Sequence, residues 1–450
     1  IIGCTNPVGG KTKTVFDVIA TVDFVVVTLT FVELCYLAWL AVNDRKFITD
    51  QEFCIVYLLR KRKRIRKLVN KLRQRFNSGL VFQLKDDFGE ADISLRPLKD
   101  IYVNVVIQEG QEKMNDYSGT FDRHRIYQFH LGNSRTVTKL ESTADIFKPM
   151  KENKSQKYPK KILVIGRPGI GKTMLTKKLL YQWKTQEDEF WHDKIVILLQ
   201  FRAFTEKTIT LREMLGHGEG LSPDDFETVY ETILSTPTSA VLIFDGLDEL
   251  DVDSKLLRGT LESVCRPEKE MPVFSIFRML VDGRLLPGVT VLTTSRPTAH
   301  TVLHNLNFER TVEILGFFEE QIKEYVFKFC KNDGDTAELI WNQIQKSAEL
   351  LSLCYVPVNS YIVCLTLKER TENDQSSGTP KTVTELYKTA VKILIYRHHP
   401  MYKFEPRPID YLSIPLPKKV ENDLLELSEI AKDGIKEGKL IFERITGPEF

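Results

Sequence analysis

The residues most able to do chemistry lie at 166–173, which reads Gly-Arg-Pro-Gly-Ile-Gly-Lys-Thr. This matches the pattern G-x-x-x-x-G-K-[ST] at every fixed position. Glycines let backbone N–H groups close around phosphate oxygens, and a helix that begins here points its positive end at the same anion. We expect Lys172 to reach the β- and γ-phosphates of a nucleoside triphosphate and the Thr173 hydroxyl to ligate Mg²⁺. The expected phosphate-binding set is Gly166, Arg167, Pro168, Gly169, Ile170, Gly171, Lys172 and Thr173.

The sequence on either side supplies the strand and the helix that such a loop requires. Residues 162–165 are a short apolar run typical of a buried strand, and apolar residues at helical spacing follow Thr173. A glycine-rich turn before an ordinary helix explains the motif less well, because strand, loop and helix follow in register. A second Gly-Lys-Thr sequence at 10–12 lacks the first glycine of the motif and a preceding strand. We therefore expect residues 1–15 to form a loop.

A cluster of carboxylates follows the apolar run at 241–244. Asp245 ends that run, so its side chain should emerge at the carboxyl end of a strand beside the P-loop and hold Mg²⁺. Asp248 and Glu249 lie three and four residues further on and could polarise an attacking water. Alone, an acidic cluster after a strand is usually a solvated turn. Its position downstream of a P-loop favours a Walker B site.

A third block at 286–297 reads Leu-Pro-Gly-Val-Thr-Val-Leu-Thr-Thr-Ser-Arg-Pro and ends another apolar run. Arg296 follows this run, at the sheet edge expected for Lys172 and Asp245, where an arginine can interact with a γ-phosphate. An arginine after a strand is commonly a surface residue, and this one gains its meaning from being third in order. The expected catalytic residues are Asp248, Glu249 and Arg296, and the expected metal ligands are Thr173 and Asp245.

Short apolar runs recur from residue 161 onwards, with helical patterns between most of them. Strands that alternate with helices predict a parallel, three-layer α/β sheet with right-handed crossovers. Ligands of such a sheet lie outside the carboxyl ends of its strands. From residue 316 the pattern becomes all-helical. The expected strands are 162–165, 195–199, 241–244, 289–292 and 312–315.

The composition describes an ordinary folded protein. Hydrophobic residues make up 42% and charged residues 28% of the 450 residues, which leaves room for about two to four domains. Seven scattered cysteines without a C-x-x-C pair argue against a disulfide framework or a zinc site and favour a reducing compartment. The formal net charge of +2 indicates no particular partner, and no nucleic-acid ligand is expected.

An apolar stretch at 24–42 contains Glu33 as its only charged residue. Its 19 residues would just span a bilayer, and Glu33 near the centre would cost about 2.5–3.5 kcal/mol. Abundant Val, Leu, Phe and Trp side chains could offset that cost. The alternative is a buried helix of a small helical domain with Glu33 exposed. The sequence leaves both alternatives open.

A strongly basic segment follows. Residues 60–76 contain ten Lys or Arg and no acidic residue, with apolar residues at helical spacing, which predicts a basic amphipathic helix. It could flank a spanning helix on the cytosolic side or lie on anionic lipid. It could also bind nucleic acid, which no motif supports, or simply be a solvated helix face. Membrane contact through 24–76 therefore stays open.

Together the three blocks resemble the NACHT module of Nod-like receptors, a branch of the STAND class of P-loop NTPases. The resemblance covers about residues 145–450, because Leu-Gly-Phe-Phe-Glu-Glu-Gln-Ile-Lys-Glu-Tyr-Val at 315–326 and Cys-Tyr-Val-Pro at 354–357 follow in the family's order. It implies an ATP/ADP-binding sheet domain, a helical domain and a winged-helix domain. The proline of the CYVP-type motif packs on the adenine in that family, so Pro357 inherits this role.

The sequence pattern and the resemblance together predict five parts of the chain. They are a hydrophobic and basic helical region (1–80), a lead-in segment that packs against the NTPase (81–158), the NACHT nucleotide-binding domain (159–315), a helical domain (316–380) and a partial winged-helix domain (381–450). The first part resembles no death-fold or pyrin effector. Neither the effector nor the ligand can be named from the sequence.

The resemblance also implies a function. ADP would hold the domains closed, and exchange for ATP with Mg²⁺ would favour an open form that self-associates through the NACHT module. Hydrolysis would be slow. Such an innate-immune or related intracellular receptor would be cytoplasmic, and anchored to a membrane if 24–42 spans one. The competing hypothesis is a turnover ATPase of the AAA type, a remodeller, which requires a separate arginine finger that the sequence does not clearly provide.

Overall fold

The computed structural model divides the chain into two compact units, Ile1–Lys67 and Leu68–Phe450. All residues of the predicted phosphate-binding, catalytic and metal-binding sets belong to the second unit and are described. The structure describes residues 8–43, 63, 65–74, 83–84, 96–110, 139–149, 158–206, 208–218, 223–250, 252, 266–331, 333–372, 382–398 and 411–437.

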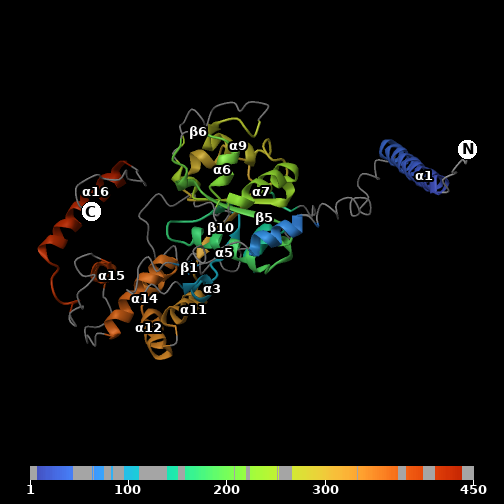
Figure 1. Cartoon of the computed structure of the whole chain (residues 1–450). Helices are drawn as coiled ribbons and strands as arrows, with labels where there is room; N and C mark the ends of the chain where they lie inside the picture. Colours follow the sequence, from blue (N-terminus) through green and yellow to red (C-terminus); the bar gives the residue numbers. More distant parts are fainter. Residues whose placement is uncertain are drawn as a thin grey trace, which may run out of the picture. The chain divides into compact units, whose positions relative to one another are not determined.

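The first unit contains the long helix α1 (Val8–Asn43; Figure 1). The apolar stretch at 24–42 is thus part of a longer helix, and the prediction of a loop at 1–15 is wrong for residues 8–15. Gly9 and Gly10 do not prevent the helix because they lie in its first turn, where backbone N–H groups have no intrahelical partner in any case. No proline follows before Asn43 to interrupt it.

The second unit is built around a six-stranded sheet of order β3-β10-β4-β9-β7-β5. Five of its strands (β4, β5, β7, β9 and β10) run parallel to one another, which confirms the predicted parallel α/β sheet. Residues of the central strands are almost all buried, and burial on both faces explains why they read as continuous apolar runs. The parallel strands are β4 (Lys161–Ile165), β5 (Ile195–Gln200), β7 (Ala240–Asp245), β9 (Thr290–Ser295) and β10 (Arg310–Gly316).

Helices cover the sheet and position its carboxyl edge (Figure 1). α5 (Lys172–Thr185) contacts β5, β7 and β9 and buries Leu175, Leu179 and Trp183. Phe277 of α9 (Val273–Val281) packs edge-on against Phe244 of β7 at 5.0 Å between ring centroids. The remaining elements of this region are α6 (Leu211–Gly216), α7 (Pro223–Ser235), α10 (His300–Leu303), β6 (Thr208–Ile209), β8 (Met271–Pro272), η4 (Glu189–Trp191), η5 (Phe201–Ala203), η6 (Pro237–Ser239) and η7 (Leu247–Glu249).

The segment before the P-loop adds an edge strand to the sheet. β3 (Val106–Glu109) pairs antiparallel with β10, and only the last two residues of the strand-like apolar run at 101–107 belong to it. Ile101 belongs instead to the short helix α3 (Leu98–Ile101). The chain then runs past the P-loop before it joins the sheet. Other elements of this segment are β1 (Gln83–Leu84), β2 (Arg96–Pro97) and η3 (Thr143–Phe147).

Arg310, at the start of β10, fastens this segment to the sheet. Its side chain is only 3% exposed and pairs with Glu109 of β3. Its Nη1 donates to the carbonyl oxygens of Asp145, Ile146 and Lys148 at 2.7, 2.8 and 2.7 Å. A buried guanidinium with charged and carbonyl acceptors on several sides is costly to disrupt, because its partners would lose their hydrogen bonds together.

Residues 65–74 of the basic segment are helical. Val69 and Leu72 are 0% and 5% exposed, and Arg73 Nη2 donates to the backbone oxygen of Trp191 at 2.6 Å. The apolar side that an anionic lipid surface would have to contact is therefore covered by protein at these positions.

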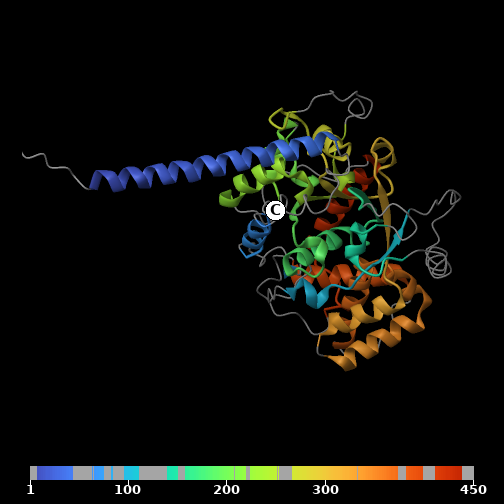
Figure 2. The same cartoon turned by 90° about the vertical axis from the view of Figure 1, so that its right-hand side faces the viewer.

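The region after β10 is helical in its described residues, which confirms that part of the fold prediction. α14 contacts α11, α12, α13 and α15, and the helices that follow the sheet are drawn in orange and red in Figure 2. Buried side chains of Leu365, Ile393, Tyr396 and Tyr411 form a hydrophobic cluster there. The identification of 381–450 as a partial winged-helix domain stays a prediction. The helices are α11 (Glu319–Cys330), α12 (Gly334–Lys346), α13 (Ala348–Cys354), α14 (Pro357–Glu372), α15 (Val383–His398) and α16 (Lys418–Glu437).

Candidate nucleotide-binding site

The P-loop joins the end of β4 to the first turn of α5. Gly169 and Gly171 have φ angles of +71° and +105°, a backbone region that side chains with a Cβ rarely adopt. Lys172 Nζ donates to the carbonyl oxygens of Gly166 at 2.8 Å and Arg167 at 3.1 Å, so the amine lies folded over the loop. Burial lowers the pKa of Lys172 from its usual value, because a charged amine loses hydration there.

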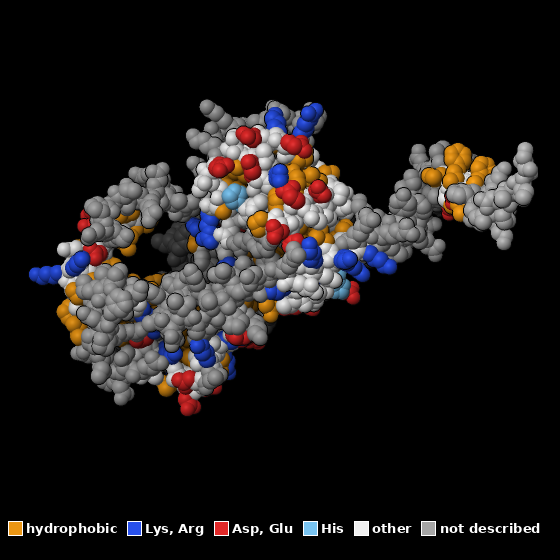
Figure 3. Space-filling model, viewed as in Figure 1, with side chains coloured by type: hydrophobic (Ala, Val, Ile, Leu, Met, Phe, Trp, Pro, Cys, Tyr) orange, Lys and Arg blue, Asp and Glu red, His pale blue; other side chains and the backbone are white. Residues whose placement is uncertain are grey.

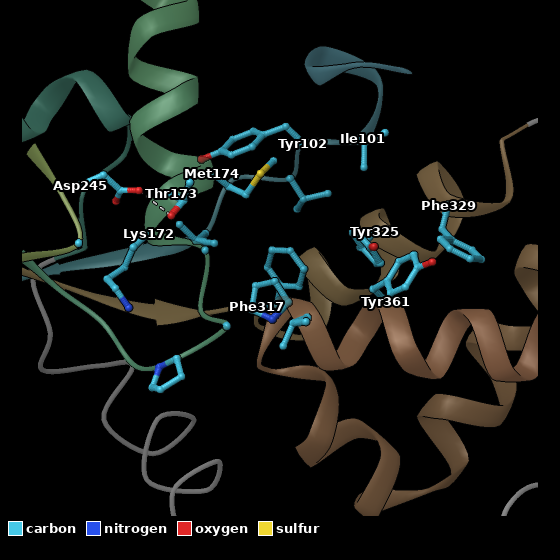
Figure 4. Close-up of a pocket in the computed structure, with 18 of the residues that line it drawn as sticks. Ile101, Tyr102, Lys172, Thr173, Met174, Asp245, Phe317, Tyr325, Phe329 and Tyr361 are labelled. Atoms are coloured by element: carbon cyan, nitrogen blue, oxygen red, sulfur yellow. Dashed lines mark hydrogen bonds between the residues drawn. The ribbon is translucent and has the colours of Figure 1, made fainter. Parts of the chain in front are cut away.

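Asp245 meets the P-loop at the end of β7. Its Oδ2 accepts a hydrogen bond from Thr173 Oγ1 at 2.7 Å (Figure 4), and its Oδ1 accepts one from Thr294 Oγ1 at 2.6 Å. The structure thus brings together the two residues that the sequence predicts as metal ligands. A hydroxyl and a carboxylate are hard oxygen donors of the kind that Mg²⁺ binds, so this pair fits the expected ion.

Asp248 and Arg296 form an ion pair beside Asp245. Asp248 Oδ2 lies 2.8 Å from Arg296 Nε, and Asp248 Oδ1 accepts a hydrogen bond from the Arg296 backbone N–H at 3.0 Å. Both carboxylate oxygens of Asp248 are therefore engaged by one residue. This ion pair holds Arg296 just after the end of β9, in the same cavity as Lys172.

Glu249 is the third carboxylate of this edge. Burial raises the pKa of Glu249, and the negative charges of Asp245 and Asp248 raise it further, while Arg202 and Arg296 oppose this effect. A carboxylate whose pKa is raised binds a proton more readily and is better matched to general-base chemistry near neutral pH.

A cavity of about 480 Å³ extends from the P-loop to the helical region. Its lining continues from Lys172 and Thr173 to the apolar side chains that Figure 4 shows between α3, α5 and the helices beyond β10. We call the part near the P-loop the phosphate end and the apolar part the base end. Residues of the base end are Ile101, Tyr102, Val103, Val105, Phe317, Tyr325, Phe329 and Tyr361.

Pro357 lies where the two ends meet, at the N-terminus of α14. The next residue, Val358, donates its backbone N–H to the carbonyl oxygen of Gly169 at 3.4 Å. A Cβ on Gly169 would lie only 2.4 Å from Val358 Cγ1. The P-loop and the helical region are thus in direct backbone contact, which glycine alone permits at this position. The packing of Pro357 on an adenine stays a prediction.

The predicted site residues do not all face the cavity. Gly166, Arg167 and Ile170 are not among its lining residues, and the Ile170 side chain is buried. Those that line it are Pro168, Gly169, Gly171, Lys172, Thr173, Asp245, Asp248, Glu249, Arg296 and Pro357.

The base end was not found from the sequence. Phe317 and Phe329 carry helical spacing that predicts only an inward face, and such a face serves core and ligand equally. Tyr102 belongs to the strand-like run 101–107, yet its hydroxyl oxygen is buried without a hydrogen-bond partner among the residues that the structure describes. Burial also raises the pKa of Tyr102. No local pattern links Tyr102 to α11 and α14, because tertiary packing alone brings them together.

The chain is similar in sequence to known proteins. Residues 160–333 match the family model described as NACHT domain. The NACHT, LRR and PYD domains-containing protein 1 homolog of Danio rerio is 26% identical over 343 residues, which are 75% of this chain and 23% of that protein. NACHT, LRR and PYD domains-containing protein 3 of Homo sapiens is 30% identical over 224 residues, 49% of this chain and 21% of that protein. The chain thus spans about a quarter or less of these relatives.

A solved structure of a RuvB variant from Thermotoga maritima aligns with 56% of this chain and 73% of its own, at 10% identity and a TM-score of 0.27. A structural similarity at this level supports no conclusion. The description of the fold rests instead on the sheet topology, and the similarity to the NACHT family rests on the family match.

Proposed function

Residues 160–333 of this chain are a NACHT domain, and from this premise we propose that the protein is a nucleotide-controlled signalling switch. ADP would hold the sheet domain and the helical region closed. Exchange for ATP with Mg²⁺ would favour an open form that self-associates through the NACHT domain, and slow hydrolysis would reset it. Such a switch requires that the two nucleotides bind the two arrangements with different affinities.

The contact between the P-loop and α14 supports this proposal most directly. Gly169 accepts a hydrogen bond from the Val358 N–H, so a P-loop that closes around phosphates must either keep or move the N-terminus of α14. Phe317 donates its N–H to the carbonyl oxygen of Tyr355 at 2.8 Å, between the end of β10 and the same helical region. A change at the phosphates therefore has a direct path to the helices.

Within this proposal the three predicted catalytic residues have separate roles. Glu249, with its raised pKa, would accept a proton from the attacking water. Arg296 would interact with the γ-phosphate, and Asp248 would hold Arg296 in position through their ion pair. A bound Mg²⁺ would neutralise phosphate charge, with Thr173 and Asp245 as its protein ligands.

The alternative is a turnover ATPase of the AAA type. It predicts fast steady-state hydrolysis, whereas a switch predicts rapid nucleotide exchange with slow hydrolysis. Both require the same P-loop, so binding alone does not separate them. The hydrolysis rate and the change of assembly state do.

The test uses the purified chain with ADP or a non-hydrolysable ATP analogue, each with Mg²⁺. We expect a fluorescent nucleotide to bind, ATP in a separate assay to be hydrolysed slowly, and the ATP analogue alone to raise the mass measured by light scattering. Lys172→Ala should lose nucleotide binding, ATP hydrolysis and the rise in mass. Lys177→Ala, on the same helix but outside the cavity lining, is the matched control. Sustained fast turnover without assembly would favour the remodeller.

We also propose that α1 lies in a lipid bilayer and places a cytoplasmic NACHT domain at a membrane. Residues Ile19–Tyr36 have a mean hydropathy of 1.8 and none of this window is buried. Hydrophobic side chains lie on the visible face of the coloured part of α1 (Figure 3), and consecutive Val25, Val26 and Val27 are all more than half exposed. A helix that is apolar on every side does not fit a one-sided protein groove.

The threonines of α1 are compatible with hydrocarbon. Thr30 Oγ1 donates to the carbonyl oxygen of Val26 at 2.9 Å, and Thr28 bonds back to Phe24 and Val25 in the same way. Their hydroxyls therefore need no water, as a lipid environment requires. The full chain should stay with membranes after carbonate extraction, and Val26→Arg with Leu29→Arg should release it. Release of the unaltered chain into the soluble fraction would remove this proposal.

A further inference from the structure

Thr294 on β9 was not assigned a role by its sequence pattern, yet it lies at the centre of the hydrogen bonds around Asp245. Its Oγ1 donates to Asp245 Oδ1 at 2.6 Å and accepts from the Gly246 backbone N–H at 2.9 Å. Thr294 is fully buried and is not among the lining residues of the cavity. It can therefore act on a nucleotide only through Asp245.

The two hydrogen bonds fix the direction of the Thr294 hydroxyl. A hydroxyl has one proton to donate, and the Gly246 N–H already occupies a lone pair of this oxygen. The proton must point to Asp245, because that is the acceptor at 2.6 Å. Gly246 reaches this position with a φ angle of +79°, a conformation that glycine adopts without strain.

Fixing Oδ1 of Asp245 also fixes Oδ2. The carboxylate is planar, so once Oδ1 is held by Thr294 the other oxygen is directed at Thr173 of the P-loop, where it accepts at 2.7 Å. Without the Thr294 hydroxyl the carboxylate could rotate about its Cβ–Cγ bond. We infer that Thr294 is a positioning residue that aims Asp245 at the Mg²⁺ of the bound nucleotide. This inference rests on the proposed nucleotide binding.

The adjacent residue offers a matched control. Thr293 is fully buried on the same strand, but its Oγ1 has no hydrogen-bond partner in the part of the chain that the structure describes. Strand geometry directs neighbouring side chains to opposite faces. Thr→Val has the same shape in both positions, so the two variants differ in whether a hydroxyl that contacts Asp245 is removed.

The experiment measures the dissociation constant of a fluorescent ADP for the full chain, in excess Mg²⁺ and in EDTA. For the unaltered chain, Mg²⁺ should strengthen binding. Thr294→Val should weaken binding in Mg²⁺ by about tenfold, the factor expected for losing a hydrogen bond to a charged group, and leave binding in EDTA within about twofold. Thr294→Ser, which keeps the hydroxyl, should restore the Mg²⁺ effect, and Thr293→Val should not change it.

A purely structural role of Thr294 would weaken binding equally with and without Mg²⁺, and that result would overturn the inference. An unchanged Mg²⁺ effect in Thr294→Val would overturn it as well, while leaving nucleotide binding itself intact. An unaltered chain that binds no nucleotide in either buffer would refute the proposed function and the inference together. If Thr294→Val does not fold, Thr294→Cys, whose thiol is a weaker donor, should show a Mg²⁺ effect that is smaller than that of Thr294→Ser but not zero.

Discussion

The two ends of the nucleotide cavity are built in different ways. The phosphate end is polar and consists of residues at or shortly after strand ends, such as Asp245 at the end of β7 and Lys172, which begins α5 after the loop that follows β4. The base end is aromatic and apolar and combines α3 with helices that follow the sheet, from Tyr102 to Tyr361. One end depends on local backbone geometry, and the other on how distant segments pack.

This difference assigns different tasks to the two ends. Phosphate groups are common to all nucleotides, so in the proposed nucleotide complex hydrogen bonds and charges at Lys172, Thr173 and Asp245 would supply affinity without distinguishing bases. The base end has the side chains that can distinguish one base from another, and it also includes residues of the helical region. We therefore expect variants at the phosphate end to weaken all nucleotides alike and variants at the base end to change selectivity.

The largest expected effect is on the segment that carries Tyr102 to the base end. Arg310→Ala removes the guanidinium that holds Glu109 and three backbone carbonyls, and breaking a buried ion pair costs about 3–5 kcal/mol. The free energy of unfolding, measured with a chemical denaturant, should fall by about this amount. Arg212→Ala, which removes an exposed ion pair with Glu227, should cost less than about 1 kcal/mol. Similar losses in both variants would contradict the role of Arg310.

Lys172→Ala should have the next largest effect. A hydrogen bond to a charged group contributes about 3 kcal/mol at most, which corresponds to about 100-fold in the dissociation constant. The phosphate end does not contact the base, so ADP and GDP should lose affinity by the same factor. Fluorescence titration measures both. A loss confined to ADP would show that the two ends are not separable.

A smaller effect is expected for Tyr102→Phe at the base end. The buried Tyr102 hydroxyl has no hydrogen-bond partner among the described residues, so its removal should raise the melting temperature without nucleotide. If a nucleotide accepts or donates a hydrogen bond there, its affinity should fall by about three- to tenfold, as for loss of one neutral hydrogen bond. Adenine and guanine nucleotides should respond unequally. A variant with a raised melting temperature and unchanged affinities would leave the hydroxyl without a binding role.

The smallest expected effect concerns Glu249 and pH. Its pKa in the folded chain is raised above the usual 4.5, with burial as the largest cause. As pH rises through 4.5, the unfolded chain releases this proton while the folded chain retains it, so the group's contribution to the free energy of unfolding decreases up to its folded pKa.

Glu249→Gln removes this titration. The variant should therefore gain stability relative to the unaltered chain as pH rises from 4 to 7, as thermal melts across that range would show. Glu231→Gln, at an exposed position on α7, is a control that should show no such trend. The same Glu249→Gln variant should bind ATP but cleave it more slowly. A constant difference in melting temperature across the pH range would argue against the raised pKa.

How much of the structure could be predicted from the sequence also depends on whether a feature is set locally or by the packing of distant segments. β4, the P-loop and α5 were correctly placed because fixed glycines, an apolar run and helical spacing are read within about 20 residues. The predicted loop is wrong at residues 8–15 because the Gly-Gly pair lies in the first turn of a helix that meets no proline up to Asn43. The role of Arg310 had no local signal, since its acceptors lie about 160 to 200 residues away.

The sequence by itself determined the parallel sheet and placed Lys172, Asp245 and Arg296 at its carboxyl edge, because periodicity and motif spacing are local properties of the chain. Only the tertiary structure decided that Thr294 directs Asp245, that Asp248 is occupied by Arg296, and that Tyr102 faces the helices beyond β10. These contacts join segments separated in sequence, and hydrogen-bond direction and packing become defined only when those segments are brought together.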